Sequence, residues 1–213
     1  MISVVGIGNA ASKIADLFSD TNNYEVYTLN DSVKRSSKRK FKLKNFDTPE
    51  EYEGNIPDLK NFFSDISTDI QVIVVGSSYS SNYVLGILEQ IKDKNLDVFY
   101  IKPDSDLLTG TPKLIENTVF GVLQEYARSA MFGSLTIISN LEIEKSLDNI
   151  PIKRYYEAIN NTIFSMIHYV NYFTHAEPEI GMVSKPLEIN RIRSFGAIDP
   201  KNLEEKWFFE LDT

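Results

Sequence analysis

Short apolar runs and segments with helical spacing follow one another along most of the chain. The runs are residues 2–7, 25–29, 70–75, 97–101 and 134–139, and the helical segments between them are residues 10–18, 83–92 and 113–129. Continuous apolar runs of this length are typical of strands buried on both faces of a parallel sheet. The alternation predicts a doubly wound, mostly parallel α/β sheet of Rossmann-like topology, with ligands at the carboxyl ends of its strands.

Residues 151–174 have the strongest helical pattern. Apolar side chains recur at intervals of three and four, at Ile152, Tyr156, Ile159, Ile163, Met166, Ile167, Val170 and Phe173. The spacing predicts a long core helix with this face buried. Pro151 suits its first turn, and Asp148 or Asn149 is a candidate cap.

Two other segments carry a local pattern. Residues 58–66 place Leu59, Phe62, Phe63 and Ile66 on one side of a predicted short helix. Residues 34–44 contain seven basic residues. This segment is either a solvated hairpin or loop with Phe41 and Leu43 turned inward, or a docking patch for an acidic partner or nucleic acid.

Composition narrows the classes of function. The net charge of −8 disfavours nucleic-acid binding outside residues 34–44, and no apolar run approaches the ~20 residues of a membrane helix. There is no cysteine, and the two histidines have no carboxylate cluster around them, so we expect no metal site. We expect a cytoplasmic protein. Its predicted parts form a single compact unit: a nucleotide-binding-like α/β domain (1–150), the core helix (151–174), and a post-helix loop, short helix and tail (175–213).

The first strand ends in G-I-G-N-A-A and continues into a helix. Such a turn presents backbone N–H groups and the positive end of a helix dipole to phosphate. Asp31, after the second strand, suits a ribose contact. Gly6, Gly8, Ala11 and Asp31 therefore keep a Rossmann-type dinucleotide-dependent enzyme as one hypothesis, although no residue set resembles a hydride or proton-relay site.

Several strings, in order, resemble the tubulin/FtsZ family. V-I-V-V-G-S-S-Y-S-S-N stands at the family's strand and phosphate loop, and D-V-F-Y-I-K-P at its next strand. S-L-T-I-I-S-N-L-E-I-E resembles the strand before the core helix, and G-M-V-S-K-P-L-E-I-N-R-I-R the loop and helix after it. The likeness is collinear over about residues 1–198. It implies a sheet of the tubulin/FtsZ GTPase-domain type with a long core helix.

The resemblance also implies a GTP or GDP site. Tyr156 stands where the family stacks an aromatic ring on guanine, and Asn161 where a carboxylate receives the base. An amide there weakens guanine selection. The other implied cofactor-binding residues are Gly6, Gly8, Asn9, Asn30, Gly76, Ser77, Ser78, Ser80 and Asn140.

Three departures from the family bear on activity. The phosphate loop keeps only Gly76 and carries the bulky Tyr79, although its serine hydroxyls are still available to an anion. The acidic residues of the post-helix loop align with Lys185 and Glu188, which leaves Glu188 as the one catalytic candidate. We expect no counterpart of the family's second domain, and we expect the aromatic tail around Trp207 to dock on the body.

We therefore weigh three hypotheses. The first is a tubulin/FtsZ-like structural or assembly protein with a degenerate nucleotide pocket that is not an efficient GTPase. The second is a GTP-binding, self-assembling cytoskeletal GTPase, and the third is the Rossmann-type enzyme. Under the first two, the expected partners are other structural proteins or further copies joined head to tail. The composition, rich in Asn, Ile and Lys, suits a virus-encoded relative.

Overall fold

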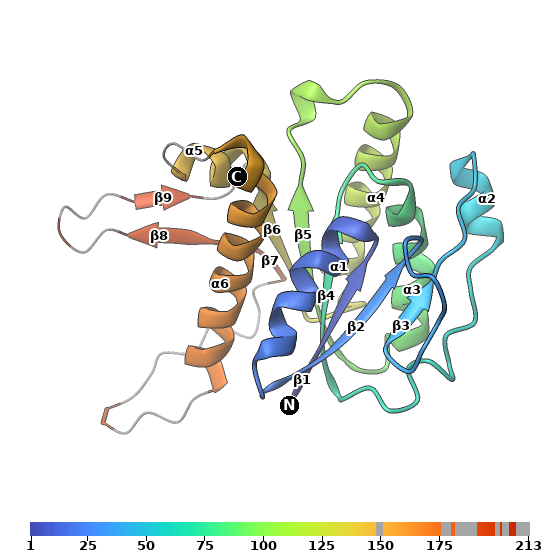
Figure 1. Cartoon of the computed structure of the whole chain (residues 1–213), viewed down its shortest axis with the longest axis horizontal. Helices are drawn as coiled ribbons and strands as arrows, with labels where there is room; N and C mark the ends of the chain where they lie inside the picture. The colour runs from blue at the N-terminus through green and yellow to red at the C-terminus, as the bar shows by residue number, and fades with distance from the viewer. Residues whose placement is uncertain (148–150, 176–179, 182–190, 199–200, 202–204, 208–213) are drawn as a thin grey trace.

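Seven parallel strands form the centre of the computed structural model, which describes the chain except residues 148–150, 176–179, 182–190, 199–200, 202–204 and 208–213. Their order across the sheet is β3-β2-β1-β4-β5-β6-β7. The strands are β1 (Ile2–Ile7), β2 (Tyr24–Asn30), β3 (Lys40–Lys42), β4 (Asp69–Val75), β5 (Asn95–Lys102), β6 (Ser134–Ser139) and β7 (Ile192–Ser194). The chain builds outward from β1 to β3 and then in the other direction from β4, so the order reverses between β1 and β4 (Figure 1).

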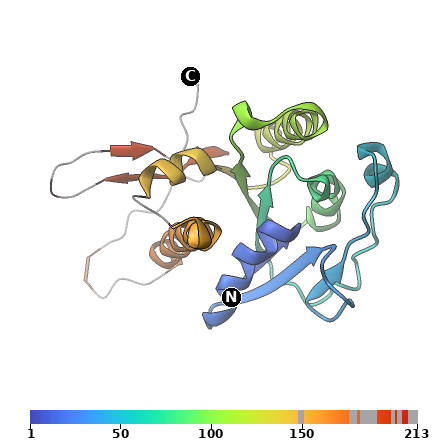
Figure 2. The same ribbon diagram turned by 45° about the horizontal axis from the view of Figure 1, so that its top comes forward.

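Helices cover both faces of this sheet (Figures 1 and 2). One face carries α2 (Pro49–Gly54), α3 (Val84–Ile91) and α4 (Gly110–Arg128). The other carries α1 (Asn9–Asp16), α5 (Asn140–Ser146) and α6 (Tyr155–His175), and the ring of Phe18, just after α1, lies 4.7 Å from that of Phe164 in α6. The short 3₁₀ turns are η1 (Leu17–Asp20), η2 (Tyr79–Tyr83), η3 (Ser105–Leu107) and η4 (Ile152–Arg154), and β8 (Gly196–Ile198) pairs antiparallel with β9 (Glu205–Trp207). The doubly wound parallel sheet predicted from the sequence is confirmed.

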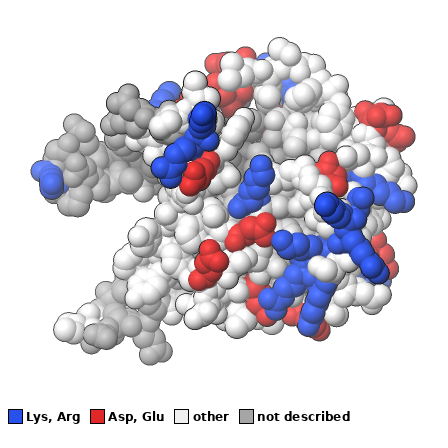
Figure 3. All heavy atoms as spheres, viewed as in Figure 1, with Lys and Arg blue, Asp and Glu red and all other residues white. Residues whose placement is uncertain are grey.

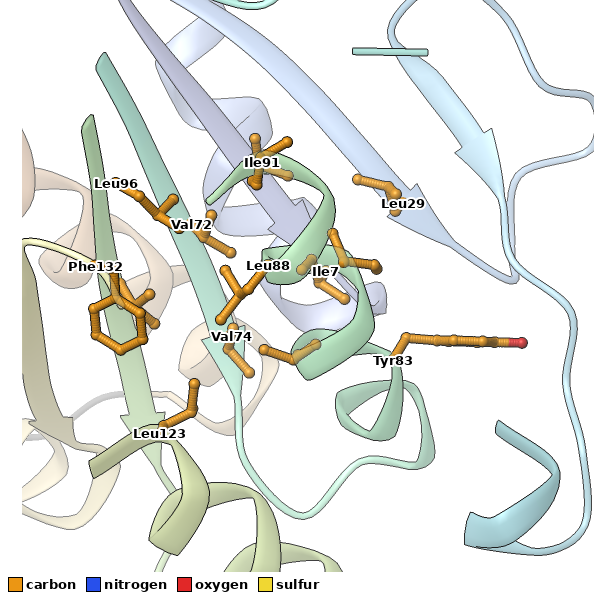
Figure 4. Close-up of a cluster of buried hydrophobic side chains, with 14 of the residues drawn as sticks. Ile7, Leu29, Val72, Val74, Tyr83, Leu88, Ile91, Leu96, Leu123 and Phe132 are labelled. Carbon is orange, nitrogen blue, oxygen red and sulfur yellow. The ribbon is translucent and has the colours of Figure 1, made fainter. Parts of the chain in front are cut away.

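The core consists of two apolar layers separated by the sheet. In the layer beneath α3 and α4, strand residues such as Val72 and Val74 pack against Leu88 and Leu123 (Figure 4). Central strands have both faces covered, which explains why β1 and β4 are almost wholly apolar. This packing holds the carboxyl ends of β1, β2, β4 and β5 at one edge, where the predicted phosphate turns lie.

The core helix forms, but it begins at Tyr155 instead of Pro151, Ile152 lies exposed in the preceding turn η4, and the buried face is narrower than the sequence predicts. Ile159, Ile163 and Ile167 are buried at the centre of the stripe. Its two ends were wrongly predicted to be buried, because the side chain of Tyr156 is 76% exposed and that of Phe173 is 57% exposed. The helix packs into the core through Ile159, Ile163, Ile167 and their neighbours, and its apolar spacing continues beyond this stretch at both ends. The proposed caps Asp148 and Asn149 lie outside the described residues.

Two further predictions need correction. Residues 58–66 form turns rather than a helix, although Leu59 and Phe63 are buried as expected. The helix of this region is instead α2, which begins with a capping box between Thr48 and Glu51. The basic segment contributes the parallel edge strand β3 rather than a hairpin, and β7 extends the sheet on the other side.

Candidate functional site

The turn after β1 has the backbone of a phosphate-binding turn. Gly8 adopts φ +92°, a left-handed conformation that suits glycine. Its N–H donates to the Leu29 carbonyl at 2.7 Å, and its carbonyl accepts from the Ser12 N–H at 2.9 Å. Among the described residues, no side chain caps the amino terminus of α1. The first N–H groups of α1 therefore remain available at the carboxyl edge of the sheet.

Asn30 braces this turn from the end of β2. Its side-chain N–H donates to the Ser12 hydroxyl at 2.8 Å, and Ser12 in turn donates to the Gly6 carbonyl at 3.3 Å. The Asn30 amide oxygen accepts from the Val33 N–H at 3.1 Å. Both ends of the buried amide are therefore engaged within the protein. Sequence reasoning missed Ser12, whose position on the first turn of α1 after the glycines was the available signal.

Asp31 places a negative charge beside the same turn. Its carboxylate accepts from the Asn9 side chain at 2.5 Å and from the Asn45 side chain at 2.7 Å. The hydrogen bond from Asn45, followed by that from Asn9, lowers the pKa of Asp31 below its usual range. Asn9 is therefore held by a charged neighbour, and a second anion at this turn meets electrostatic repulsion.

The loop after β4 packs on a buried polar cluster. A methyl group at Gly76 would overlap the Glu116 carboxylate and the Tyr100 hydroxyl and would lie 2.9 Å from Cδ of Pro103. Glu116 is buried, accepts from the Tyr100 hydroxyl, and forms an ion pair with Lys102 at 3.0 Å. Burial and the adjacent Glu116 charge raise the pKa of Tyr100. Close packing against this cluster is sufficient to require glycine at position 76.

Serine side chains lie between the two turns. The hydroxyls of Ser78 and Ser80 are 3.0 Å apart, and a methyl group at Gly8 would overlap the Ser80 hydroxyl. Ser77 has φ 64°, and Ser81 donates its hydroxyl to the Ser78 carbonyl at 2.5 Å. The structure thus brings Gly8, Ser78 and Ser80 together, as the sequence predicts.

The residues predicted to contact the guanine base, Asn140, Tyr156 and Asn161, lie where α5 and α6 begin (Figure 1). The side-chain oxygen of Asn140 is buried and has no hydrogen-bond partner in the described part of the chain. Such an orphaned acceptor is unusual and suits the N–H group of a ligand. The Tyr155 hydroxyl donates to Glu144 at 2.8 Å, joining α6 to α5, and burial together with this contact raises the pKa of Tyr155 to about 12.

Tyr156 presents its ring to solvent one turn before a pair of asparagines. Residues four apart share a helix face, so Tyr156 lies above the half-buried Asn160. Asn161 is exposed and is rotated about 140° from Tyr156 around the helix axis, at 100° per residue. Helix geometry therefore favours Asn160, which the sequence analysis did not select, as the partner of Tyr156.

The remaining predicted features lie elsewhere. Lys185 and Glu188 are outside the described residues, and no group of three or more His, Asp or Glu side chains within the described ranges could hold a metal ion.

His168 accepts from or donates to the Tyr24 hydroxyl at 3.0 Å and stacks on Phe164. A cavity of about 310 Å³ beside it opens at the amino ends of the strands, away from the turns. None of the helices described is long and apolar enough to cross a bilayer.

Comparison with known proteins identifies the fold. No family model and no curated protein matches the sequence. Among solved structures, TubZ from Bacillus thuringiensis serovar israelensis in a GTPγS-form protofilament matches with a TM-score of 0.65 at 12% identity. An FtsZ dimer from M. jannaschii matches with a TM-score of 0.60 at 13% identity, and a single-substitution variant of that FtsZ with 0.61 at 12%.

These matches cover 84–86% of this chain and 57–59% of the structures matched. The chain therefore spans less than two thirds of their length. At this identity the likeness concerns the fold alone. The fold is that of the tubulin/FtsZ GTPase domain, as the collinear strings in the sequence predict.

Proposed function

We propose that the chain is a tubulin/FtsZ-like structural or assembly protein whose nucleotide pocket is degenerate and which is not an efficient GTPase. One observation carries the proposal: the Ser80 hydroxyl lies against Gly8, so that side chains occupy the space between the two turns. A glycine loop would leave this space to phosphate oxygens and offer them backbone N–H groups.

Two neighbouring features support a weakened pocket. Gly76, the one glycine left in the loop after β4, is accounted for by its packing against Glu116 and Tyr100. The Asp31 carboxylate adds a negative charge at the other turn. Assembly is supported by the fold, since TubZ with this fold is found in a protofilament.

A second candidate is a GTP-binding, self-assembling relative, and a separate observation favours it. A purine base requires an acceptor for its N–H groups and an aromatic surface for stacking. The Asn140 oxygen, which has no partner among the described residues, offers the first, and the exposed Tyr156 ring offers the second. In this case GTP or GDP is the cofactor, and the Ser78 and Ser80 hydroxyls donate to its phosphates. The chemistry that GTP would supply is cleavage of its terminal phosphate.

Thermal unfolding with GTP, GDP, ATP and NAD, each at millimolar concentration, separates these candidates. A ligand at a hundredfold excess over its Kd stabilises the native state by about 2.7 kcal/mol. The degenerate pocket predicts no shift in Tm with any of the four. A shift confined to guanine nucleotides contradicts it and supports the second candidate, and a shift with NAD alone supports a dinucleotide enzyme.

Two variants test which residues of the pocket block or bind a nucleotide. Ser80→Gly removes the side chain that contacts Gly8. Nucleotide binding that appears only in this variant supports a blocked pocket, whereas nucleotide binding that weakens in it shows that the hydroxyl is a ligand.

Tyr156→Ala should leave the free energy of unfolding within about 0.5 kcal/mol of the wild type, because the ring is exposed. It should lower guanine affinity by about 1–3 kcal/mol if a base stacks there. Tyr169→Ala, an exposed tyrosine farther along α6, is the matched control.

A further inference from the structure

The basic segment, residues 34–44, concentrates positive charge in an acidic protein. It holds seven of the 22 basic residues and none of the 30 acidic ones. The rest of the chain, with 15 basic and 30 acidic residues, carries a formal charge of −15. Figure 3 shows Lys and Arg side chains gathered over the region where Figure 1 places β2 and β3. A polyanion should therefore be attracted most strongly to this segment.

Within the segment, lysines alternate with apolar residues, so that the two kinds lie on opposite faces of the strand. Leu43 is buried, and Phe41 packs against the core beneath α3 and α4. Lys40, Lys42 and Lys44 alternate with them and are exposed. Alternate residues of a strand share a face and lie about 6.6 Å apart, so Lys40 and Lys42 form a row on β3, and Lys44 follows two residues after the strand ends.

Protection of the sheet edge does not account for this row. Lysine is a common means of keeping an edge strand from pairing with other chains. Here the chain covers its own edge: the Ser37 N–H donates to the Lys40 carbonyl at 2.7 Å, and the Lys42 N–H donates to the Ser36 hydroxyl at 3.0 Å. An added peptide strand would have to displace both bonds.

Part of the charge is not neutralised. Three of the seven basic residues form ion pairs, Lys38 with Asp65 at 2.9 Å, Arg39 with Glu25 at 2.6 Å and Lys40 with Asp16 at 3.8 Å. In the described part of the chain, four have no ion pair: Lys34, Arg35, Lys42 and Lys44. All four are exposed.

We propose that residues 34–44 bind the sugar–phosphate backbone of a nucleic acid. Protein interfaces centre on buried aromatic and apolar anchors and are depleted in lysine. Stable membrane anchoring likewise needs a second, apolar signal. None of the large exposed apolar residues of the described chain lies in this segment. Four exposed cations that have no ion pair among the described residues, and no apolar anchor beside them, fit phosphates and recognise them without regard to base sequence.

The test is fluorescence anisotropy of the full chain with a labelled mixed-sequence DNA duplex at increasing salt. With four unpaired cations, the slope of log K against log salt should be about −3.6. The affinity should therefore fall on the order of 100-fold between 50 and 200 mM salt. Lys42→Glu/Lys44→Glu should lower it at least roughly tenfold at 50 mM salt, and Lys34→Glu/Arg35→Glu should do the same from the adjoining loop.

Lys113→Glu/Lys153→Glu is the matched control, because both lysines are exposed, lie outside the segment and bring the same change in net charge. It should bind DNA nearly as tightly as the wild type. Equal losses in the control and in the segment variants would overturn the proposal, as would a wild type that does not bind at 50 mM salt. Binding to phosphatidylserine vesicles or to polyglutamate without binding to DNA would assign the segment to a membrane or an acidic protein instead.

Discussion

Gly76 shows how a residue retained in a phosphate-type loop can be required for packing. Glu116, Tyr100 and Pro103 surround the position that a Cβ atom would take. Gly76→Ala should therefore lower the free energy of unfolding by about 1–3 kcal/mol, as overpacking does. Urea unfolding measures this. Gly121→Ala is the control, since no atom of the described residues lies within 4 Å of a Cβ there and alanine favours the interior of α4. Equal stability of Gly76→Ala and the wild type would contradict the packing explanation.

Asp31 gives a prediction that depends on pH. Its pKa is lowered in the folded state, so its hydrogen bonds stabilise the protein above the ordinary aspartate pKa of about 4. That stabilisation is lost as the pH falls through the lower, folded value. Asp31→Asn should cost about 1 kcal/mol at pH 7, because it turns an amide toward the Asn9 and Asn45 donors.

Urea midpoints of the wild type and of Asp31→Asn, measured between pH 3 and pH 7, test this. The difference in stability between the two proteins should shrink as the pH falls. Asp20→Asn, at an exposed carboxylate with no hydrogen-bond or ion-pair partner among the described residues, should show no such trend. A difference that stays constant with pH would mean that the carboxylate charge is not what Asn9 and Asn45 recognise.

At the scale of elements, a buried amide pair attaches α6 to the sheet. Gln71 of β4 and Asn171 of α6 exchange two hydrogen bonds of 2.7 Å. Asn171→Leu leaves the Gln71 amide buried without its partner, which should cost about 1–3 kcal/mol. Gln71→Leu/Asn171→Leu should cost less than the sum of the two single variants. Additive losses in urea unfolding would mean that the two amides are not coupled.

Elements built from local patterns were predictable, and the contacts between them were not. Apolar runs predicted β1 and β4, and the glycines predicted the turn after β1, because strand burial and backbone conformation leave a local signature in the sequence. The pairing of Gln71 with Asn171 joins residues a hundred positions apart and has no local signature. The capping box of α2 was the exception, a local signal that was present and overlooked.

The candidate site divides in the same way. Its position at the carboxyl ends of the strands follows from the topology, so Gly8, Ser78 and Ser80 were correctly expected to meet. The Glu116 cluster beneath Gly76 was not predictable, because an acidic residue on a helix is ordinarily solvated. The exposure of Tyr156 also escaped prediction, since a 3-4 spacing does not reveal which part of a helix packs against the core.

On the scale of the whole molecule, the two ends of the sheet differ. The carboxyl end carries the turns around Gly8 and Ser80, and the amino end carries the cavity beside His168. A head-to-tail contact, which we propose for assembly, joins these unlike surfaces and therefore extends into a filament instead of closing as a symmetric dimer. Light scattering that stays flat with and without nucleotide would contradict assembly of any kind.

The polarity of such a filament can be tested with a variant that is defective at one end only. Tyr79, 38% exposed in the loop after β4, lies at the carboxyl end. Tyr79→Glu should not pellet by itself, but its intact amino-end surface should still add to wild-type filaments and stop their growth. A small fraction of this variant should therefore reduce the pelleted wild-type protein far beyond simple dilution. Asn117→Glu, with the same charge change on the exposed side of α4, should only dilute the wild type. If Tyr79→Glu also acts by dilution alone, the contact between copies is not head to tail.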